Sequence, residues 1–121
     1  MVQLVTFAIA FSLPLSMWTD HAHAATIEKG DRIGSLYGIP KKPKLNIYQG
    51  TSANELDKKN AIGHVSWTPM PGRVGTVGMA CHRVSHSAPC YYLNRLTKDK
   101  NVTISFKGIT YTYVVVRQKT V

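Results

Sequence analysis

Histidine and cysteine are the side chains of this sequence best suited to chemistry near neutral pH. His82 ends an apolar run over residues 76–82, where Gly78 and Ala80 share its face. Small neighbours leave room for a substrate chain beside an imidazole, which exchanges protons near neutral pH. His82 is therefore a candidate general acid or base. The alternative is a histidine that is merely hydrogen-bonded at the end of a strand.

The two cysteines, Cys81 and Cys90, leave several roles open. Because successive side chains of a strand point to opposite faces, a reactive pair of Cys81 with His82 is not expected. Cys81 is expected to pack in the core as a small apolar side chain. Cys90 follows the polar loop 83–89. It could be a free thiol, a nucleophile served by His82 or, in an exported protein, the disulfide partner of Cys81.

Neither a metal centre nor a cofactor is expected from the residue spacing. His64, His82, His86 and the two cysteines match no known arrangement of closely spaced ligands. There is no Gly-rich phosphate loop. The 15 Lys and Arg outnumber the 6 Asp and Glu, but the densest basic run, 40–44, has no aromatic residues between its charges. A solvated basic surface is therefore expected, and not a nucleic-acid site.

The elements that must position these residues are mainly β-strands, in a chain of 121 residues that forms one domain. Ser52 with Glu55 three residues later predicts a short helical turn. Alternation around Lys107-Gly108 predicts a hairpin, and the class is a barrel or sandwich. The expected elements are a linker over 25–38, strands over 45–48, 76–82, 102–106 and 109–116, and helical turns over 51–58 and 91–96.

The N-terminal segment, residues 1–24, predicts export of the protein. Residues 1–19 carry no charged side chain, and Ala22-x-Ala24 has the form of a signal-peptidase site. The segment could be a signal peptide, but it lacks the usual Lys or Arg near its start, which favours an uncleaved membrane anchor. The expected location is the outer face of the cell membrane, or outside the cell if the leader is cleaved.

Several segments, in order along the chain, resemble the sortase family, and class E sortases of actinobacteria above all. Residues 39–51 resemble the first barrel strand and the turn after it. Residues 62–72, with Gly63-His64, resemble the stretch before the catalytic strand. The strand that ends in the catalytic histidine is matched by Gly75-Thr76-Val77-Gly78-Met79-Ala80-Cys81-His82-Arg83, and the similarity continues through 84–89, 93–96 and 109–116.

The resemblance implies a membrane-tethered β-barrel cysteine transpeptidase. In this family a thiolate attacks a Leu-Ala-x-Thr-Gly or Leu-Pro-x-Thr-Gly sorting signal after Thr. The acyl-enzyme then passes to an amine of the cell-wall precursor. By this match His82 is the catalytic histidine, while His64 and Arg83 are expected near the same cleft.

Two departures from the family pattern limit what the resemblance implies. Cys81 stands where the family usually has Gly. No residue matches the family's cysteine strand or its later arginine, and neither Arg83 nor Arg117 takes that arginine's place. The expectation is therefore a sortase-like barrel incomplete at its C-terminal end, 39–121, which is a truncated transpeptidase. The alternative is a non-catalytic module that binds a peptide or an anionic wall polymer.

Overall fold

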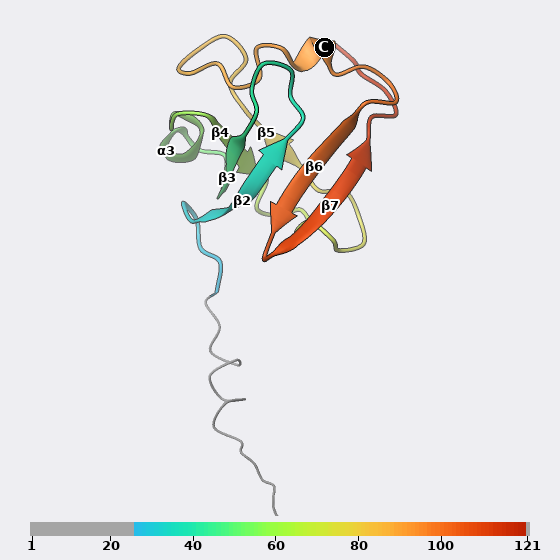
Figure 1. Ribbon diagram of the computed structural model, residues 1–121. Helices are drawn as coiled ribbons and strands as arrows, with labels where there is room; N and C mark the ends of the chain where they lie inside the picture. The colour runs from blue at the N-terminus through green and yellow to red at the C-terminus, as the bar shows by residue number, and fades with distance from the viewer. Residues whose placement is uncertain (1–25, 121) are drawn as a thin grey trace, which may run out of the picture.

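Six strands form one mixed sheet that curls into a half-barrel in the computed structural model, which describes residues 26–120 (Figure 1). The sheet order is β5-β4-β3-β2-β6-β7. The mainly β, barrel-like class expected from the sequence is confirmed. The strands are β2 (Arg32–Tyr37), β3 (Leu45–Gln49), β4 (Ala61–His64), β5 (Met79–Ala80), β6 (Asn101–Phe106) and β7 (Ile109–Val114).

Two short helical elements accompany the sheet within the described residues. Helix α3 (Ala53–Leu56) connects β3 to β4, and the 3-10 turn η1 (Leu93–Arg95) precedes β6. None of the helices between residues 26 and 120 has the length and apolar character needed to cross a bilayer. The segment 1–24, expected to be a leader or anchor, lies outside the described residues.

The hairpin of β6 and β7 is the most regular part of the sheet. The two strands pair antiparallel from Asn101 opposite Val114 to Phe106 opposite Ile109. Lys107 and Gly108 between them have φ values of 51° and 77°. A two-residue turn with two positive φ angles matches the right-handed twist of the flanking strands. The hairpin predicted from the sequence is thus confirmed.

Strand β2 corrects the expectation of a linker over residues 25–38. It lies in the middle of the sheet, with antiparallel β3 on one side and antiparallel β6 on the other. Ser35 and Leu36 are buried there. A side chain at Gly34 would overlap the carbonyl oxygen of Ser105, so β6 approaches closely because residue 34 is glycine. Gly34, one of the residues that suggested a linker, is thus required by this close pairing.

The apolar core lies between the sheet and the segment that follows β5. Strands β3 and β4 run parallel, joined by the crossover through α3, and every residue of β4 is buried. A strand covered in this way cannot show the alternation of a half-exposed one. The buried apolar side chains that form this core cluster are Leu36, Ile39, Leu45, Ile47, Ile62, Cys90, Leu96, Ile104 and Phe106.

Strand β5 is shorter than the strand expected over 76–82. Only Met79 and Ala80 pair with β4, opposite His64 and Gly63. The N–H of Gly78 instead donates to the hydroxyl of Thr68, at 3.0 Å. The residues before Met79 therefore belong to the loop between β4 and β5, and His82 begins a second loop directly after the sheet.

Candidate functional site

His82 lies just beyond the end of β5, where its side chain reaches the rim of the half-barrel. Its Nε2 is 2.8 Å from Oδ1 of Asp57. The His82 side chain is 28% exposed and that of Asp57 is 42% exposed. The contact thus forms at the protein surface, where the imidazole is held by a carboxylate and is still open to solvent or a substrate.

Asp57 is placed by the end of α3, whose start is fixed by a capping box. The backbone N–H of Ser52 donates to Oε1 of Glu55 at 2.9 Å, and the Ser52 hydroxyl donates to the same carboxylate. Asp57 then caps the C-terminal end of the helix. Glu55 and Asp57 are only two residues apart, but the side chain of Glu55 is buried and that of Asp57 is exposed. The helical turn was predicted from the sequence, but nothing in the sequence pointed to Asp57 as a partner of His82.

The hydrogen bond from the Ser52 hydroxyl lowers the pKa of Glu55. Burial of the carboxyl acts in the opposite direction, while the Ser52 N–H and the positive charge of Lys29 lower the pKa further. The net effect is a pKa below the usual range of a glutamate. Glu55 is therefore a fixed anion that holds the start of α3 in place.

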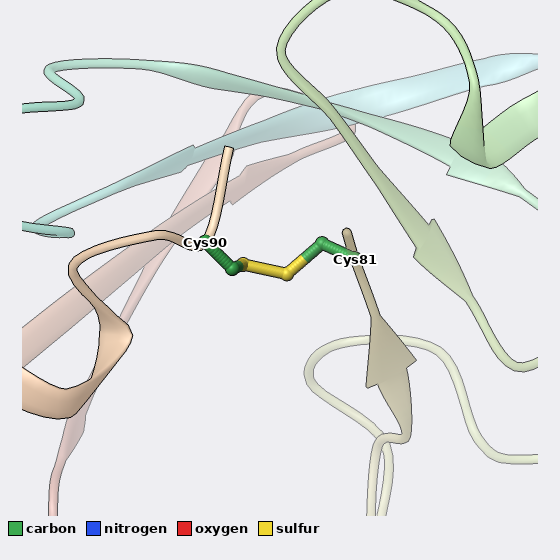
Figure 2. Close-up of a disulfide and its surroundings, with 2 residues drawn as sticks. All are labelled: Cys81 and Cys90. Atoms are coloured by element: carbon green, nitrogen blue, oxygen red, sulfur yellow. A yellow bond between two sulfur atoms is a disulfide. The ribbon is translucent and has the colours of Figure 1, made fainter. Parts of the chain in front are cut away.

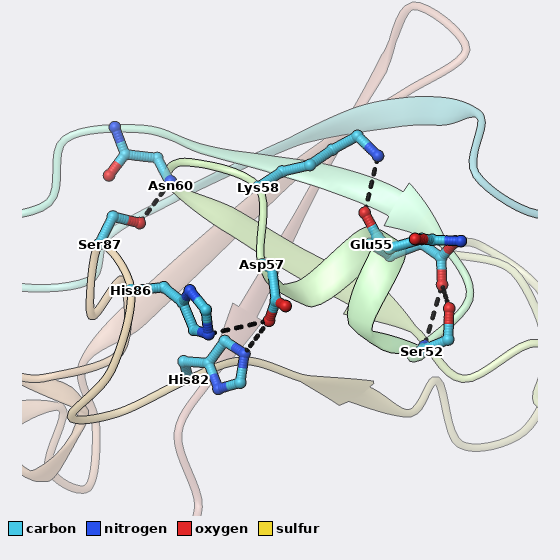
Figure 3. Close-up of polar contacts among 9 residues, drawn as sticks. Ser52, Glu55, Asp57, Lys58, Asn60, His82, His86 and Ser87 are labelled. Atoms are coloured by element: carbon cyan, nitrogen blue, oxygen red, sulfur yellow. Dashed lines mark hydrogen bonds and ion pairs between the residues drawn. The ribbon is translucent and has the colours of Figure 1, made fainter.

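His86 joins the same carboxylate from the loop after His82. Its Nε2 lies 3.1 Å from Oδ1 of Asp57, and the two imidazole rings are 4.6 Å apart between centroids. Figure 3 shows both rings pointing toward Asp57 from one side. We refer to Asp57, His82 and His86 as the rim cluster.

A disulfide joins Cys81 to Cys90 and closes the loop that carries both histidines (Figure 2). The two Cα atoms are 6.0 Å apart, within the usual range for such a bond. Cys90 is the buried member, at 2% exposure, and Cys81 is only partly buried. Of the alternatives that the sequence left open, pairing is the one observed. A free thiol or nucleophile at Cys90 and an unpaired core Cys81 were wrong.

Further bonds hold the loop against the body of the protein. The N–H of Cys90 donates to the carbonyl of His82 at 3.0 Å. The N–H of Asn60 donates to the hydroxyl of Ser87 at 2.7 Å (Figure 3), and Lys42 Nζ donates to the Ser87 carbonyl at 3.1 Å. The loop is thus attached at its ends by the disulfide and near its middle by Ser87.

His64 occupies a different environment from His82. It is completely buried, with Nδ1 2.7 Å from Oε1 of Gln49 and Nε2 2.9 Å from the carbonyl oxygen of Pro69. Both ring nitrogens are therefore engaged within the protein. His64 joins the end of β3 to the loop after β4, and the expectation that it lines a cleft with His82 is not what the structure shows.

Arg83, the other residue expected near the cleft, is exposed. Its side chain lies on the outer surface, where it borders two shallow hollows together with Asn94. It takes part in no hydrogen bond or ion pair with residues 26–120 that would connect it to His82. Its expected contribution to the site is thus not apparent in this arrangement.

An apolar hollow of about 320 Å³ lies between the two edges of the curled sheet. Val77 and Met79 line it from the β5 side, and Val102, Ile104 and Tyr113 line it from β6 and β7. Met79 belongs to β5, and His82 lies two residues beyond the end of that strand.

The comparison that decides the family is a match of the Sortase domain profile to residues 39–121. This chain belongs to the sortase family. The resemblance inferred from the sequence is thereby confirmed. No curated protein sequence matches the chain, so the family assignment rests on the domain profile.

Solved sortase structures share this fold. Sortase E from Streptomyces avermitilis superposes with a TM-score of 0.68 at 22% identity, covering 75% of this chain and 60% of its own. Sortase E1 from Streptomyces coelicolor, solved with a tripeptide in the active site, gives 0.62 at 26%, covering 72% and 58%. Sortase C1 from Streptococcus agalactiae gives 0.65 at 28%, covering 88% and 56%. The chain thus spans about three-fifths of the length of the class E sortases.

Proposed function

We propose that this chain carries the histidine side of a sortase-type cysteine transpeptidase site, with His82 as the general acid. The observation that supports it most is the position of His82. In a chain of the sortase family, this histidine lies two residues beyond the end of β5 and remains accessible, and Met79 of that strand lines an apolar hollow. The residues that match the family's histidine motif and the geometry of the rim therefore point to the same side chain.

The reaction would proceed through a thioester. A thiolate attacks the carbonyl carbon of Thr in the sorting signal and a C–S bond forms. The C–N bond to the next residue breaks as protonated His82 gives its proton to the leaving amine. An amine of the cell-wall precursor then attacks the thioester, passes a proton to the imidazole and releases the thiolate. Asp57 would orient the ring by accepting a hydrogen bond from Nε2.

The apolar hollow would receive the sorting-signal peptide. Its walls of Val77, Met79 and Ile104 suit a Leu side chain. The class E relative from Streptomyces coelicolor holds a tripeptide in its active site, and this supports a peptide ligand here. The substrate class would be secreted proteins with a C-terminal signal of the Leu-Ala-x-Thr-Gly or Leu-Pro-x-Thr-Gly kind.

The nucleophile of this reaction would be neither Cys81 nor Cys90. These are the only cysteines of the chain, and each sulfur is bonded to the other. A disulfide sulfur offers no thiolate. The proposal therefore assigns the thiolate, and the arginine that stabilises the oxyanion, to polypeptide other than residues 1–121.

The site of action would be the extracytoplasmic face of the cell membrane. Sortases act outside the cytoplasm, and a disulfide persists in oxidising surroundings of that kind. Residues 1–24 would then serve as the export signal or the anchor.

A second candidate, a non-catalytic sortase-like binding module, is favoured by the absence of a free thiol in the chain. A basic surface accompanies this: Arg95 stacks 4.8 Å from the ring of Tyr92, and Lys41 Nζ lies 5.9 Å from it. Such a module would bind a peptide or an anionic wall polymer without cleaving it.

Peptide cleavage distinguishes the two candidates. The full chain would be assayed with fluorogenic sorting-signal peptides, alone and fused to the cysteine-bearing C-terminal strands of a class E sortase. We expect cleavage after Thr only in the fusion, abolished by thiol alkylation and by His82→Ala. Val84→Ala, an exposed change in the same loop, is the matched control and should retain activity. Cleavage that survives His82→Ala would overturn the proposal, and peptide binding without cleavage by the fusion would favour the module.

A further inference from the structure

We propose that the rim cluster binds a divalent transition-metal ion of the zinc type through Asp57, His82 and His86. The proposal goes beyond transpeptidation, and it departs from the expectation that the sequence gives. The spacing of the histidines alone predicted no metal site, because the third side chain of the cluster, Asp57, is 25 residues away from His82 along the chain. Folding brings the three side chains together.

The first observation is the distance between the donor atoms. One ligand atom from each of the three side chains lies within 4.8 Å of the others. Two of the separations are 2.8 Å and 3.1 Å, from the carboxylate oxygen to each Nε2. Zinc bonds to nitrogen or oxygen are about 2.1 Å long, which places neighbouring ligand atoms of a tetrahedral site roughly 3.4 Å apart. Small rotations of the three side chains would therefore admit the ion.

The second observation is that the backbone presents His86 to the cluster in an uncommon conformation. His86 has a φ of 55°, in the left-handed region, which few residues other than glycine adopt. The turn that follows is fixed by the two bonds to Ser87, and the ends of the loop are fixed by the disulfide. The loop thus holds His86 beside His82 without a metal, and the ordering of these ligands precedes binding.

The types of ligand select the class of metal. Two imidazoles and one carboxylate suit Zn²⁺ and its neighbours Co²⁺, Ni²⁺ and Cu²⁺, whereas Ca²⁺ and Mg²⁺ prefer oxygen ligands. The side chains of the cluster are 28–44% exposed. A bound ion would therefore keep a position open to water, as three-ligand zinc sites do.

Occupancy would block the proposed role of His82, and this consequence rests on the proposed function. A general acid must carry a proton that it can give to the leaving amine. Coordination uses the lone pair of Nε2, so the ring cannot take up the second proton that makes it an imidazolium. The metal would then act as an inhibitor of the site, bound at the catalytic imidazole itself.

The alternative is that Asp57 forms only ordinary hydrogen bonds or ion pairs with the two rings. Metal titration without any peptide separates these two explanations, and its outcome does not depend on whether the chain is an enzyme. The full chain, kept in detergent, would carry His21→Ala and His23→Ala to remove the two histidines of the sequence that lie outside the described residues. Zn²⁺ affinity would be measured by competition with a chromophoric chelator, and Co²⁺ binding by its visible absorption.

We expect one bound Co²⁺ per chain with the intense absorption of a tetrahedral site. Loss of a ligand in His86→Ala or in Asp57→Asn should weaken Zn²⁺ binding at least about 10-fold. Ser85→Ala is the matched control in the same loop and should bind as the parent does. Circular dichroism of each variant confirms its fold. Absence of stoichiometric binding, or unchanged affinity in both ligand variants, would overturn the proposal, as would binding that disappears with His21 and His23.

Discussion

Two polar clusters of this protein use the same kind of side chain in opposite ways. In the interior cluster, His64 with Gln49 and Thr68, the imidazole is completely buried and both of its nitrogens are engaged. The rim cluster, Asp57 with His82 and His86, is partly exposed. In helix α3 and its C-terminal cap, Glu55 is buried and Asp57 is exposed.

The difference shows that burial and hydrogen bonding decide the role of each histidine here. His64 is suited to hold the fold together, whereas His82 and His86 are suited to bind or react with other molecules. A buried imidazole with both nitrogens bonded has no position left for a substrate, and its removal leaves unsatisfied partners. An exposed imidazole can exchange protons or accept a metal, and it contributes little to folding. The following predictions test this contrast, from the largest expected effect to the smallest.

Replacement of the buried histidine should cost the most stability. His64→Ala removes the partner of Gln49 and leaves a cavity, so we expect the free energy of unfolding to fall by about 2–4 kcal/mol. His82→Ala should lower it by less than about 1 kcal/mol. Equilibrium urea denaturation of the two variants measures the difference. Equal losses would contradict the division between the clusters.

Removal of the disulfide should loosen the rim without disturbing the interior. Cys81→Ser with Cys90→Ser opens a short closed loop, for which chain entropy predicts a loss of about 2.5 kcal/mol. Amide hydrogen exchange should accelerate across residues 82–90 and stay slow in β4. Reduction of the unmodified chain with a thiol reagent is the control and should reproduce the pattern. Acceleration spread evenly over the sheet would mean that the bond supports the whole fold.

At acid pH, the carboxylate of Glu55 should no longer contribute to the stability of the folded state. The lowered pKa of Glu55 means that its ionised form stabilises the folded state above the ordinary carboxyl pKa. That contribution is lost as the pH falls through the folded-state value. Glu55→Gln should therefore be less stable than the parent near pH 7, and the difference should close below about pH 4. Denaturation curves recorded across pH measure this difference, with Glu28→Gln, at an exposed position, as the control variant.

The smallest change in stability is expected for the outward-facing carboxylate. Asp57→Asn breaks contacts that are open to solvent, and exposed ion pairs contribute roughly 0–1 kcal/mol. Thermal unfolding should thus differ little from that of the parent. A loss as large as that of His64→Ala would show that the rim cluster is part of the structural core.

Much of the fold could be predicted from the sequence where local chemistry is decisive. The Lys107-Gly108 turn and the alternation around it located the hairpin. Ser52 and Glu55 located the start of α3 through their reciprocal bonds. These features depend on residues within a few positions of each other, and sequence spacing reports such contacts directly.

Structural features that depend on contacts between residues far apart in the sequence could not be predicted from it. Strand β2 carries glycine and polar residues, and only its two neighbouring strands make it a central strand. In the candidate site, His82 was predicted from its small neighbours and from the family motif. Its contact with Asp57 was not, because that contact joins a helix end to a loop 25 residues later. The burial of His64 likewise follows from β3 and the Pro69 carbonyl.

The central position of β2 has a consequence for how the chain is made. Gly34 pairs with Phe106, which is synthesised 72 residues later. At about 5–20 residues per second, this interval lasts roughly 4–14 s. Throughout it, β2 can pair with β3 but has an unpaired edge that invites association with other chains. The nascent protein therefore depends on the hairpin of β6 and β7 to complete the sheet. A ribosome that stalls before Phe106 would leave one edge of β2 unpaired and prone to associate with other chains.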